Sequence, residues 1–304
     1  MNDRPAGGSV TPNATKLSAL MRFFSSAVFR ELAKKGRSPL FRRLLEQSDL
    51  EKSCDASATV GDVFDTAFAI LKVTGLRDEY IYRTALTRKV LMGKHSLRTA
   101  SMLNEFRVGS CKADLVILNG TATVYEIKSE RDSLARLANQ VRNYMQVFAS
   151  VNVITSERHI GGVVAGVPDV VGVMCLSDRY SIQVVRDAAD EPGRVSPIAV
   201  FESLRSAEAV AILKAMGVSV PKVPNTQLHA VMRALFEELA PTELHAEMVR
   251  TLKRSRNLAP LTDLVSQLPE SLHAAALSIP VRRVERGRLV DAVTTPLGDT
   301  IAWV

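Results

Sequence analysis

Cysteine and histidine are scarce in this chain of 304 residues, and neither is spaced for metal binding. The three cysteines, Cys54, Cys111 and Cys175, are odd in number and far apart, so they predict no disulfide framework. The five histidines form no HxxxH or HxH pair, which disfavours a zinc enzyme. A chain without structural disulfides is typical of a reducing compartment, so we expect a cytoplasmic location.

Long hydrophobic runs are also lacking. The longest, Val163–Leu176, is too short to cross a bilayer and is interrupted by Pro168 and Asp169. The first residues lack the apolar segment of a signal peptide, and we find no internal repeat. The sequence therefore predicts no membrane partner.

Apolar residues make up 46% of the chain, which is enough to bury a sizeable core. The net charge of +7 suits a polyanionic partner such as nucleic acid, but a charge of this size also serves solubility. Residues 1–49 carry nine lysines and arginines against four acids, either as a phosphate-facing surface or as a solvated helix face. A second basic cluster has no aromatic neighbours and fits contact with a phosphate backbone better than base stacking: Arg282, Arg283, Arg286 and Arg288.

The two ends of the chain have helical periodicity. Residues 1–13 are rich in small and polar residues and are predicted to be disordered. Residues 14–74 form a predicted helical extension, with two helices between Lys16 and Leu50 that separate near Gly36–Pro39, and another over Val60–Val73. Residues 191–304 form a predicted, mainly helical C-terminal region with a hairpin around Pro296–Asp299.

Residues 75–190 form the predicted core. Asp78 is the expected N-cap of a helix that ends at Gly93. Period-two alternation then predicts three strands, which are followed by a long helix and further strands. The predicted elements are the helix Glu79–Met92, the strands Met102–Val108, Lys112–Leu118 and Ala122–Lys128, the helix Ser129–Phe148, the strand Val151–Thr155 and the strand pair Asp169–Leu176 and Tyr180–Val185.

Glu126 and Lys128 are two residues apart on a predicted strand, so their side chains share a face. Whether Asp114 joins them depends on the turn at Asn119–Gly120. A two-residue loop would leave Asp114 and Glu126 on opposite faces. A three-residue loop over Asn119–Thr121 pairs Leu118 with Ala122, and hence Asp114 with Glu126, and we predict this second arrangement.

Two facing carboxylates repel each other unless a cation lies between them. Oxygen ligands that leave positions for water and phosphate suit Mg²⁺, with Mn²⁺ as a substitute. A lysine beside such a site, here Lys128, can orient or deprotonate an attacking water and bind the phosphate. The residues thus indicate phosphodiester hydrolysis.

The order helix, three strands, helix, strand, with an upstream acid, Asp114 and then Glu126-Ile127-Lys128, resembles the PD-(D/E)XK nuclease superfamily. Gln140 and Tyr144 form a Q-x-x-x-Y pair similar to that of the branch with the RecB nuclease domain and lambda exonuclease. The block from Asn104 to Tyr144 also resembles a largely uncharacterised bacterial family of this superfamily. The resemblance covers about residues 75–190 and departs from the superfamily name at Ala113, where proline is usual.

The resemblance implies a restriction-endonuclease-like α/β core, a mixed sheet flanked by helices, with helical N-terminal and C-terminal extensions. It implies that Asp114, Glu126 and the Ile127 carbonyl bind the metal and that Lys128 is the catalytic lysine. Gln140 and Tyr144 would position the substrate or the strands of the site, although Tyr144 also suits a core role. The upstream acid is either Glu79 on the first helix or Glu105 on the first strand, and Glu79 also suits the positive end of its helix.

We therefore expect a Mg²⁺-dependent nuclease that acts on DNA. The alternative is an inactive nuclease-fold protein that functions in nucleic-acid binding or complex assembly. A homo-oligomer or protein partner bound through the helical C-terminal region is a further hypothesis. Exonuclease or endonuclease mode, DNA or RNA preference, and pathway all stay open from the sequence.

Overall fold

The computed structural model describes residues 13–73 and 75–303, and the chain divides into two compact units. Unit 1 combines the chain up to Lys72 with Leu268–Leu272 and Val281–Val304. Unit 2 contains Val73–Gln267 and His273–Pro280. The prediction of disorder over residues 1–13 falls outside the described residues except at Asn13, whose side chain accepts a hydrogen bond from the Lys16 amide and caps the first helix.

Unit 1 is helical. Its elements are α1 (Ala14–Phe23), α2 (Ser26–Lys35), α3 (Pro39–Ser48), α4 (Val60–Leu71) and α15 (Arg283–Thr294), with 3-10 helices at Leu50–Ser53, Glu270–Leu272 and Leu297–Ala302. Its core contains Phe23, Phe41 and Phe64, whose ring centroids are 5.2–6.0 Å apart. Edge-to-face contacts of this kind add to the free energy gained from burying the rings.

Two helices were predicted between Lys16 and Leu50, and the structure has three. The prediction missed the break after Phe23, where Ser25 accepts a hydrogen bond from the Val28 amide and starts α2 as its N-cap. The predicted hairpin around Pro296–Asp299 is also wrong. That segment is a 3-10 helix, and the chain before it is α15.

The last segment of the described chain is tied to the first part of unit 1 by backbone hydrogen bonds. The Val60 amide donates to the Thr295 carbonyl at 3.0 Å, and the Leu297 amide donates to the Ala58 carbonyl at 2.8 Å. Unit 1 is therefore assembled from sequence segments that lie on either side of unit 2.

Unit 2 is built on a six-stranded mixed sheet in the order β1-β2-β3-β4-β5-β6. The strands are β1 (Ser101–Val108), β2 (Cys111–Asn119), β3 (Thr121–Lys128), β4 (Ser150–Thr155), β5 (Gly172–Leu176) and β6 (Ile182–Arg186). β3, β4 and β5 are parallel, and the pairs β1–β2, β2–β3 and β5–β6 are antiparallel. The predicted α/β class, a mixed sheet flanked by helices with helical extensions, is confirmed.

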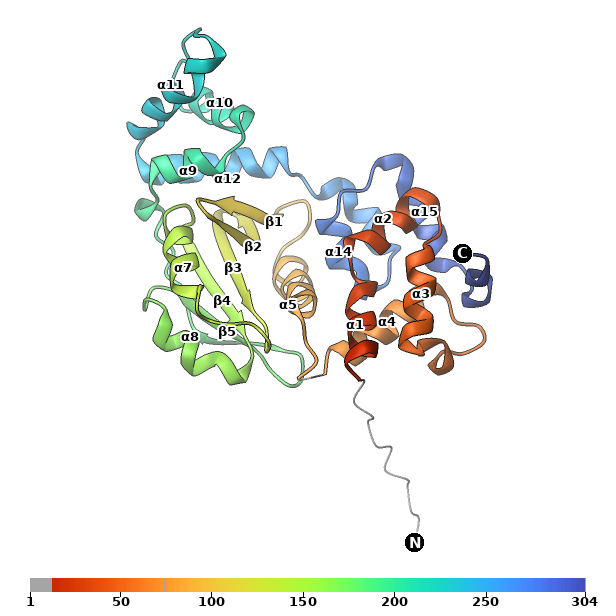
Figure 1. The fold of residues 1–304 in the computed structure, drawn as a ribbon. Coiled ribbons are helices and arrows are strands. Elements are labelled where there is room, and N and C mark those ends of the chain that lie inside the picture. The colour runs from red at the N-terminus through yellow and green to blue at the C-terminus, as the bar shows by residue number, and fades with distance from the viewer. Residues whose placement is uncertain (1–12, 74, 304) are drawn as a thin grey trace. The chain divides into compact units, whose positions relative to one another are not determined.

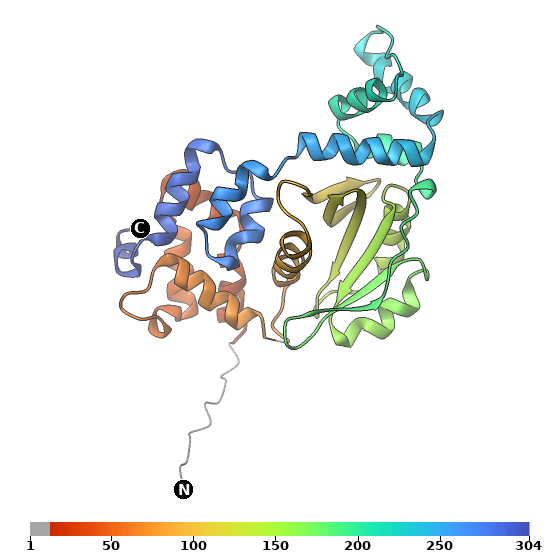
Figure 2. The ribbon, with the colours of Figure 1, turned by 180° about the vertical axis from the view of Figure 1, so that it is seen from behind.

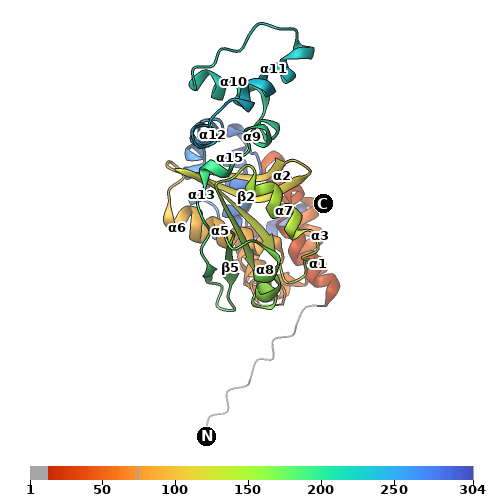
Figure 3. The same cartoon turned by 90° about the vertical axis from the view of Figure 1, so that its left-hand side faces the viewer.

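Helices cover the sheet on both faces (Figure 1). The helices of unit 2 are α5 (Glu79–Leu86), continued by a π-helical turn at Thr87–Leu91 and α6 (Met92–Lys94), then α7 (Leu137–Met145), α8 (Ile160–Gly166), α9 (Pro197–Ser203), α10 (Ser206–Ala215), α11 (Asn225–Glu237), α12 (Pro241–Ser255), α13 (Thr262–Ser266) and α14 (His273–Ser278), with 3-10 helices at Glu157–His159, Pro192–Arg194 and Ala259–Leu261. α7 and α8 lie on one face and α5 on the other (Figure 1). α12 runs along one end of the sheet (Figure 2), and α10 and α11 lie beyond α9 and α12 (Figure 3).

The helix predicted over Ser129–Phe148 is much shorter in the structure, where α7 spans Leu137–Met145. The segment before it is held as a turn because the Asp132 carboxylate accepts hydrogen bonds from the amide and hydroxyl of Ser129, at 2.8 and 2.6 Å. Such local bonds from short polar side chains compete with helix formation. The buried face of α7, with Val141 and Tyr144, packs in the core with Val124 and Val153 from the sheet.

Within the described residues, no helix is both long and apolar enough to cross a membrane.

Candidate metal centre

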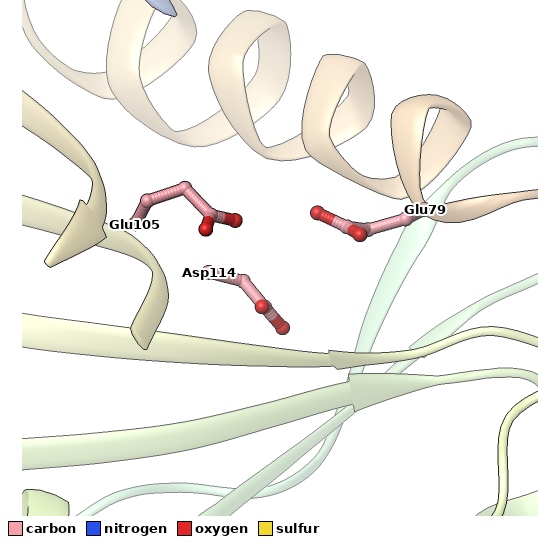
Figure 4. Close-up of side chains that lie close together, drawn as sticks. All are labelled: Glu79, Glu105 and Asp114. Atoms are coloured by element: carbon pink, nitrogen blue, oxygen red, sulfur yellow. The ribbon is translucent and has the colours of Figure 1, made fainter. Parts of the chain in front are cut away.

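Three carboxylates from three elements of unit 2 converge beside the sheet (Figure 4). Glu79 comes from the first turn of α5, Glu105 from β1 and Asp114 from β2. One oxygen from each lies within 4.8 Å of the other two. Both candidates for the upstream acid, Glu79 and Glu105, thus lie beside Asp114. We call these three residues the acidic cluster.

Glu79 reaches the cluster because α5 begins where the sequence predicts. Asp78 caps the helix by accepting a hydrogen bond from the Ile81 amide at 3.3 Å. This cap fixes Glu79 as the first helical residue, at the end where backbone N–H groups favour negative charge. Glu79 also forms an ion pair with Arg83, one turn further along the same face of α5.

Glu105 reaches the cluster through an unusual backbone conformation. Its φ is +53°, in the left-handed region that costs a residue other than glycine on the order of 1–3 kcal/mol. Residues three apart on a regular strand point to opposite faces, yet Leu103 and Phe106 both belong to the same buried core. The backbone of β1 therefore rotates at Glu105. Asn104 pairs with Leu115 and Phe106 pairs with Ala113, so Glu105 lies across from Asp114 on β2.

The hairpin between β2 and β3 has the predicted register. Leu118 pairs with Ala122, and Gly120 at the tip has a φ of +75° that glycine adopts without strain. The pairing extends to Leu115 and Tyr125, and Asp114 and Glu126 are the next residues on the two strands. The Asp114 carboxylate accepts a hydrogen bond of 2.8 Å from the Ile127 amide, which fixes it at this edge of β3.

Glu126 and Lys128 form a separate hydrogen-bonded network with α7. The Lys128 ammonium donates to Glu126 Oε1 at 2.7 Å and to Gln140 Oε1 at 2.9 Å, and Gln140 Nε2 donates to Glu126 Oε1 at 2.5 Å. Tyr144 directs its hydroxyl at Glu126 Oε2 and at the Lys112 carbonyl, both at 2.8 Å. We call Glu126, Lys128, Gln140 and Tyr144 the lysine network.

The lysine network is buried. Glu126 is 1% exposed, Lys128 is 5% exposed and Tyr144 is fully buried. The sequence left two roles open for Tyr144, positioning of the site or a place in the core. In the structure it is buried, and its hydroxyl contacts Glu126 and the backbone of β2. Gln140 contacts both charged groups and so fixes the distance between α7 and β3.

Burial raises the pKa of both Asp114 and Glu126, and like charge adds to the effect at Asp114. The pKa of Asp114 is raised to about 8, mainly by burial and in addition by the negative charges of Glu126 and Glu79. The hydrogen bond from the Ile127 amide and the charge of Lys128 act in the opposite direction and lower this pKa. Burial also raises the pKa of Glu126, while Lys128, Tyr144 and Gln140 act in the opposite direction. A divalent cation beside Asp114 would offset both burial and repulsion.

The donor set of the acidic cluster fits a hard cation. It consists only of carboxylate oxygens, it comes from three separate elements, and Glu79 and Glu105 are half-exposed, which leaves room for water and substrate. Such a set suits Mg²⁺ or Mn²⁺. Both oxygens of Glu126 are used within the lysine network, so the cluster differs from the ligand set implied by the resemblance, which joins Asp114 to Glu126 and the Ile127 carbonyl.

Sequence reasoning missed the two cations beside the cluster. Arg83 pairs with Glu79, and Lys112 Nζ lies 3.4 Å from Glu105. The i,i+4 spacing of Glu79 and Arg83 would have indicated the first pair. The second pair depends on the register of β1 and β2, which the sequence pattern did not give.

Comparison with known proteins shows a family for this chain. Residues 72–260 match the family of bacteriophage P4 protein cII. The chain belongs to this family. A curated member, protein cII of Enterobacteria phage P4, is 29% identical over 185 residues, which is 59% of this chain and 67% of that protein.

The matched region contains the acidic cluster and the lysine network and stops short of α15. A solved protein of unknown function from Silicibacter pomeroyi is 16% identical, with a TM-score of 0.27 over 41% of this chain and 86% of its own. That similarity is too low to support a common fold. None of these names states an activity, so the nuclease hypothesis depends on the residues of the site.

Proposed function

We propose that this protein is a metal-dependent nuclease that hydrolyses phosphodiester bonds, with DNA as its substrate. One observation carries the proposal: a cluster of three acids lies next to a buried lysine, and the charge of Glu126 is close enough to raise the pKa of Asp114. The element order and the Q-x-x-x-Y pair that resemble PD-(D/E)XK nucleases support it. A cytoplasmic location agrees with the proposal.

Each residue has a defined part in the proposed reaction. Glu79, Glu105 and Asp114 would hold Mg²⁺ or Mn²⁺, which when bound polarises the phosphoryl group and stabilises the leaving oxygen. Lys128 brings a positive charge toward the phosphate and orients the attacking water. Glu126 and Gln140 position Lys128 by hydrogen bonds, and Tyr144 positions Glu126 in turn.

A second candidate function has its own supporting observation. Lys128 is only 5% exposed, and its ammonium is already bonded to Glu126 and Gln140. A lysine in this state also suits a purely structural ion pair. The protein would then bind nucleic acid or assemble with a partner without cleaving, and a partner or a second copy bound by residues 191–304 belongs to this hypothesis.

Cleavage assays separate the two functions. Linear duplex, plasmid and single-stranded DNA are incubated with wild type, Asp114→Asn and Lys128→Ala, in Mg²⁺, Mn²⁺ or EDTA. Asp263→Asn, an exposed acid of α13, is the matched control. We expect metal-dependent cleavage by wild type and control, and a loss of about 100-fold or more in both site variants. Absence of cleavage by wild type on every substrate, with DNA binding unchanged in Lys128→Ala, would favour the second function.

A further inference from the structure

Two basic segments more than two hundred residues apart in the sequence meet in unit 1. α2 and α15 lie side by side (Figure 1), and the Arg288 guanidinium donates a hydrogen bond to the Lys34 carbonyl at the end of α2. α2 ends at Gly36, whose φ is +70°. A Cβ at that position would lie 3.1 Å from Cγ of Arg288, so glycine also permits the close approach of α15.

The paired helices and the residue after them carry a concentration of exposed positive charge, which we call the α2–α15 basic surface. Its members are Arg30, Lys34, Lys35, Arg37, Arg282, Arg283 and Arg288. Within the described part of the chain, Arg30, Lys34, Lys35, Arg37 and Arg283 form no ion pair. Their charge is therefore available to a partner.

The acids of these helices do little to neutralise this charge. Glu31 accepts hydrogen bonds from the Ser38 hydroxyl at 2.7 Å and from the Leu40 amide, so it serves the start of α3. Glu285 is 3% exposed and is paired with Arg282 at 2.6 Å. Asp291 is the other acid of α15, and it lies toward the C-terminal end of that helix.

The composition of the surface indicates which polyanion it fits. Its exposed members are lysine and arginine, and the aromatic residue of α2, Phe29, is buried in the core of unit 1. Recognition of unstacked bases needs exposed aromatic side chains, whereas contact with a duplex backbone needs only cations that displace counterions. The surface therefore suits phosphates along a double strand.

We propose that the α2–α15 basic surface binds the phosphate backbone of duplex nucleic acid, without reading the bases and independently of the acidic cluster. This surface lies outside residues 72–260, so it is a binding function contributed by segments that flank the part matched to the cII family. The inference goes beyond the proposed nuclease activity, because binding at this surface requires neither a metal nor cleavage.

The test measures binding in EDTA, where no hydrolysis takes place. Fluorescence anisotropy of a labelled duplex of random sequence gives the affinity of the full chain over a series of salt concentrations. The test variant is Lys35→Ala/Arg283→Ala. The control is Arg22→Ala/Arg43→Ala, which removes the same charge from exposed residues of α1 and α3.

Removing two phosphate contacts lowers the slope of log affinity against log salt by about 2, and we expect this in the test variant only. An unchanged slope in the test variant, or an equal change in the control, would overturn the proposal.

Circular dichroism and thermal melting check that each variant is folded. If the test variant fails to fold, Lys35→Gln/Arg283→Gln replaces it. Vesicles of phosphatidylserine and phosphatidylcholine form a second arm, and binding to them without binding to the duplex would also overturn the proposal. Loss of nuclease activity in any assay leaves this result unaffected.

Discussion

The acidic cluster and the lysine network meet at the neighbouring strands β2 and β3, and they differ in how their charges are balanced. The lysine network buries a carboxylate together with its own cation and supplies each oxygen with a donor. The acidic cluster brings three carboxylates within 4.8 Å, with only half-exposed contacts to Arg83 and Lys112. The first arrangement is complete within the chain, whereas we propose that an added cation completes the second. This difference separates the residues that build the proposed site from those that we propose bind a metal.

The largest effect is expected from removing the cation of the lysine network. Lys128→Met leaves Glu126 buried without its cationic partner, although Gln140 and Tyr144 still donate to it. Loss of one member of a buried ion pair typically costs about 3–5 kcal/mol in the free energy of unfolding. Urea denaturation measures this loss. Lys112→Met, which removes an exposed partner of Glu105, is the matched control and should cost less than about 1 kcal/mol. Equal losses in the two variants would contradict the comparison.

Metal binding should distinguish the two sets of carboxylates next. A cation at a hundred times its dissociation constant stabilises the folded protein by about 2.7 kcal/mol. We expect Mn²⁺ to raise the melting temperature of wild type and of Glu126→Gln, and to leave that of Asp114→Asn unchanged. If Glu126→Gln loses the response instead, the ligand set implied by the nuclease resemblance is the correct one.

The hydroxyl of Tyr144 provides a smaller test of the lysine network. Tyr144→Phe removes a hydrogen bond to a buried charged group and should destabilise the protein by about 1.5–3 kcal/mol in urea denaturation. Tyr180→Phe removes a hydroxyl that donates to the Ile81 carbonyl at 3.3 Å. That neutral bond should be worth about 0.5–1.5 kcal/mol. A larger loss at Tyr180 than at Tyr144 would show that Glu126 does not depend on Tyr144.

The smallest expected effect concerns the backbone of the acidic cluster. Glu105 has a positive φ, so Glu105→Gly should be more stable than Glu105→Ala by about 1 kcal/mol. At Arg107, two residues further along β1, alanine should be the more stable of the same two substitutions. Urea denaturation of the four variants checks the reversal of sign, and the same order at both positions would count against strain at Glu105.

The sequence was sufficient for those parts of the site that local pattern determines. Alternation of apolar residues located β1 to β3, and the Asn119–Gly120 turn gave the register of the hairpin, because a tight turn fixes pairing over the next few residues. The N-cap of α5 was predicted for the same reason, since Asp78 acts within its own turn.

The remaining parts depend on contacts between distant segments. The alternation of apolar and polar residues in β1 does not reveal that the backbone rotates at Glu105. The sequence therefore could not show that Glu79 and Glu105 both lie close to Asp114. The length of α7 was overestimated because Asp132 holds Ser129 in a turn within a stretch that also reads as helical. The meeting of α2 with α15 depends on tertiary packing alone.

The backbone bonds of Val60 with Thr295 and of Leu297 with Ala58 have a consequence for synthesis on the ribosome. All of unit 2 is synthesised before the segment Val281–Val304 that completes unit 1. Domains generally fold as units during synthesis. The sheet of unit 2 can therefore form while α1 to α4 are present and α15 has not yet been synthesised. The nascent chain thus carries the basic end of α2 without its partner helix while unit 2 is synthesised, and the α2–α15 basic surface forms only after the sheet of unit 2 has been made.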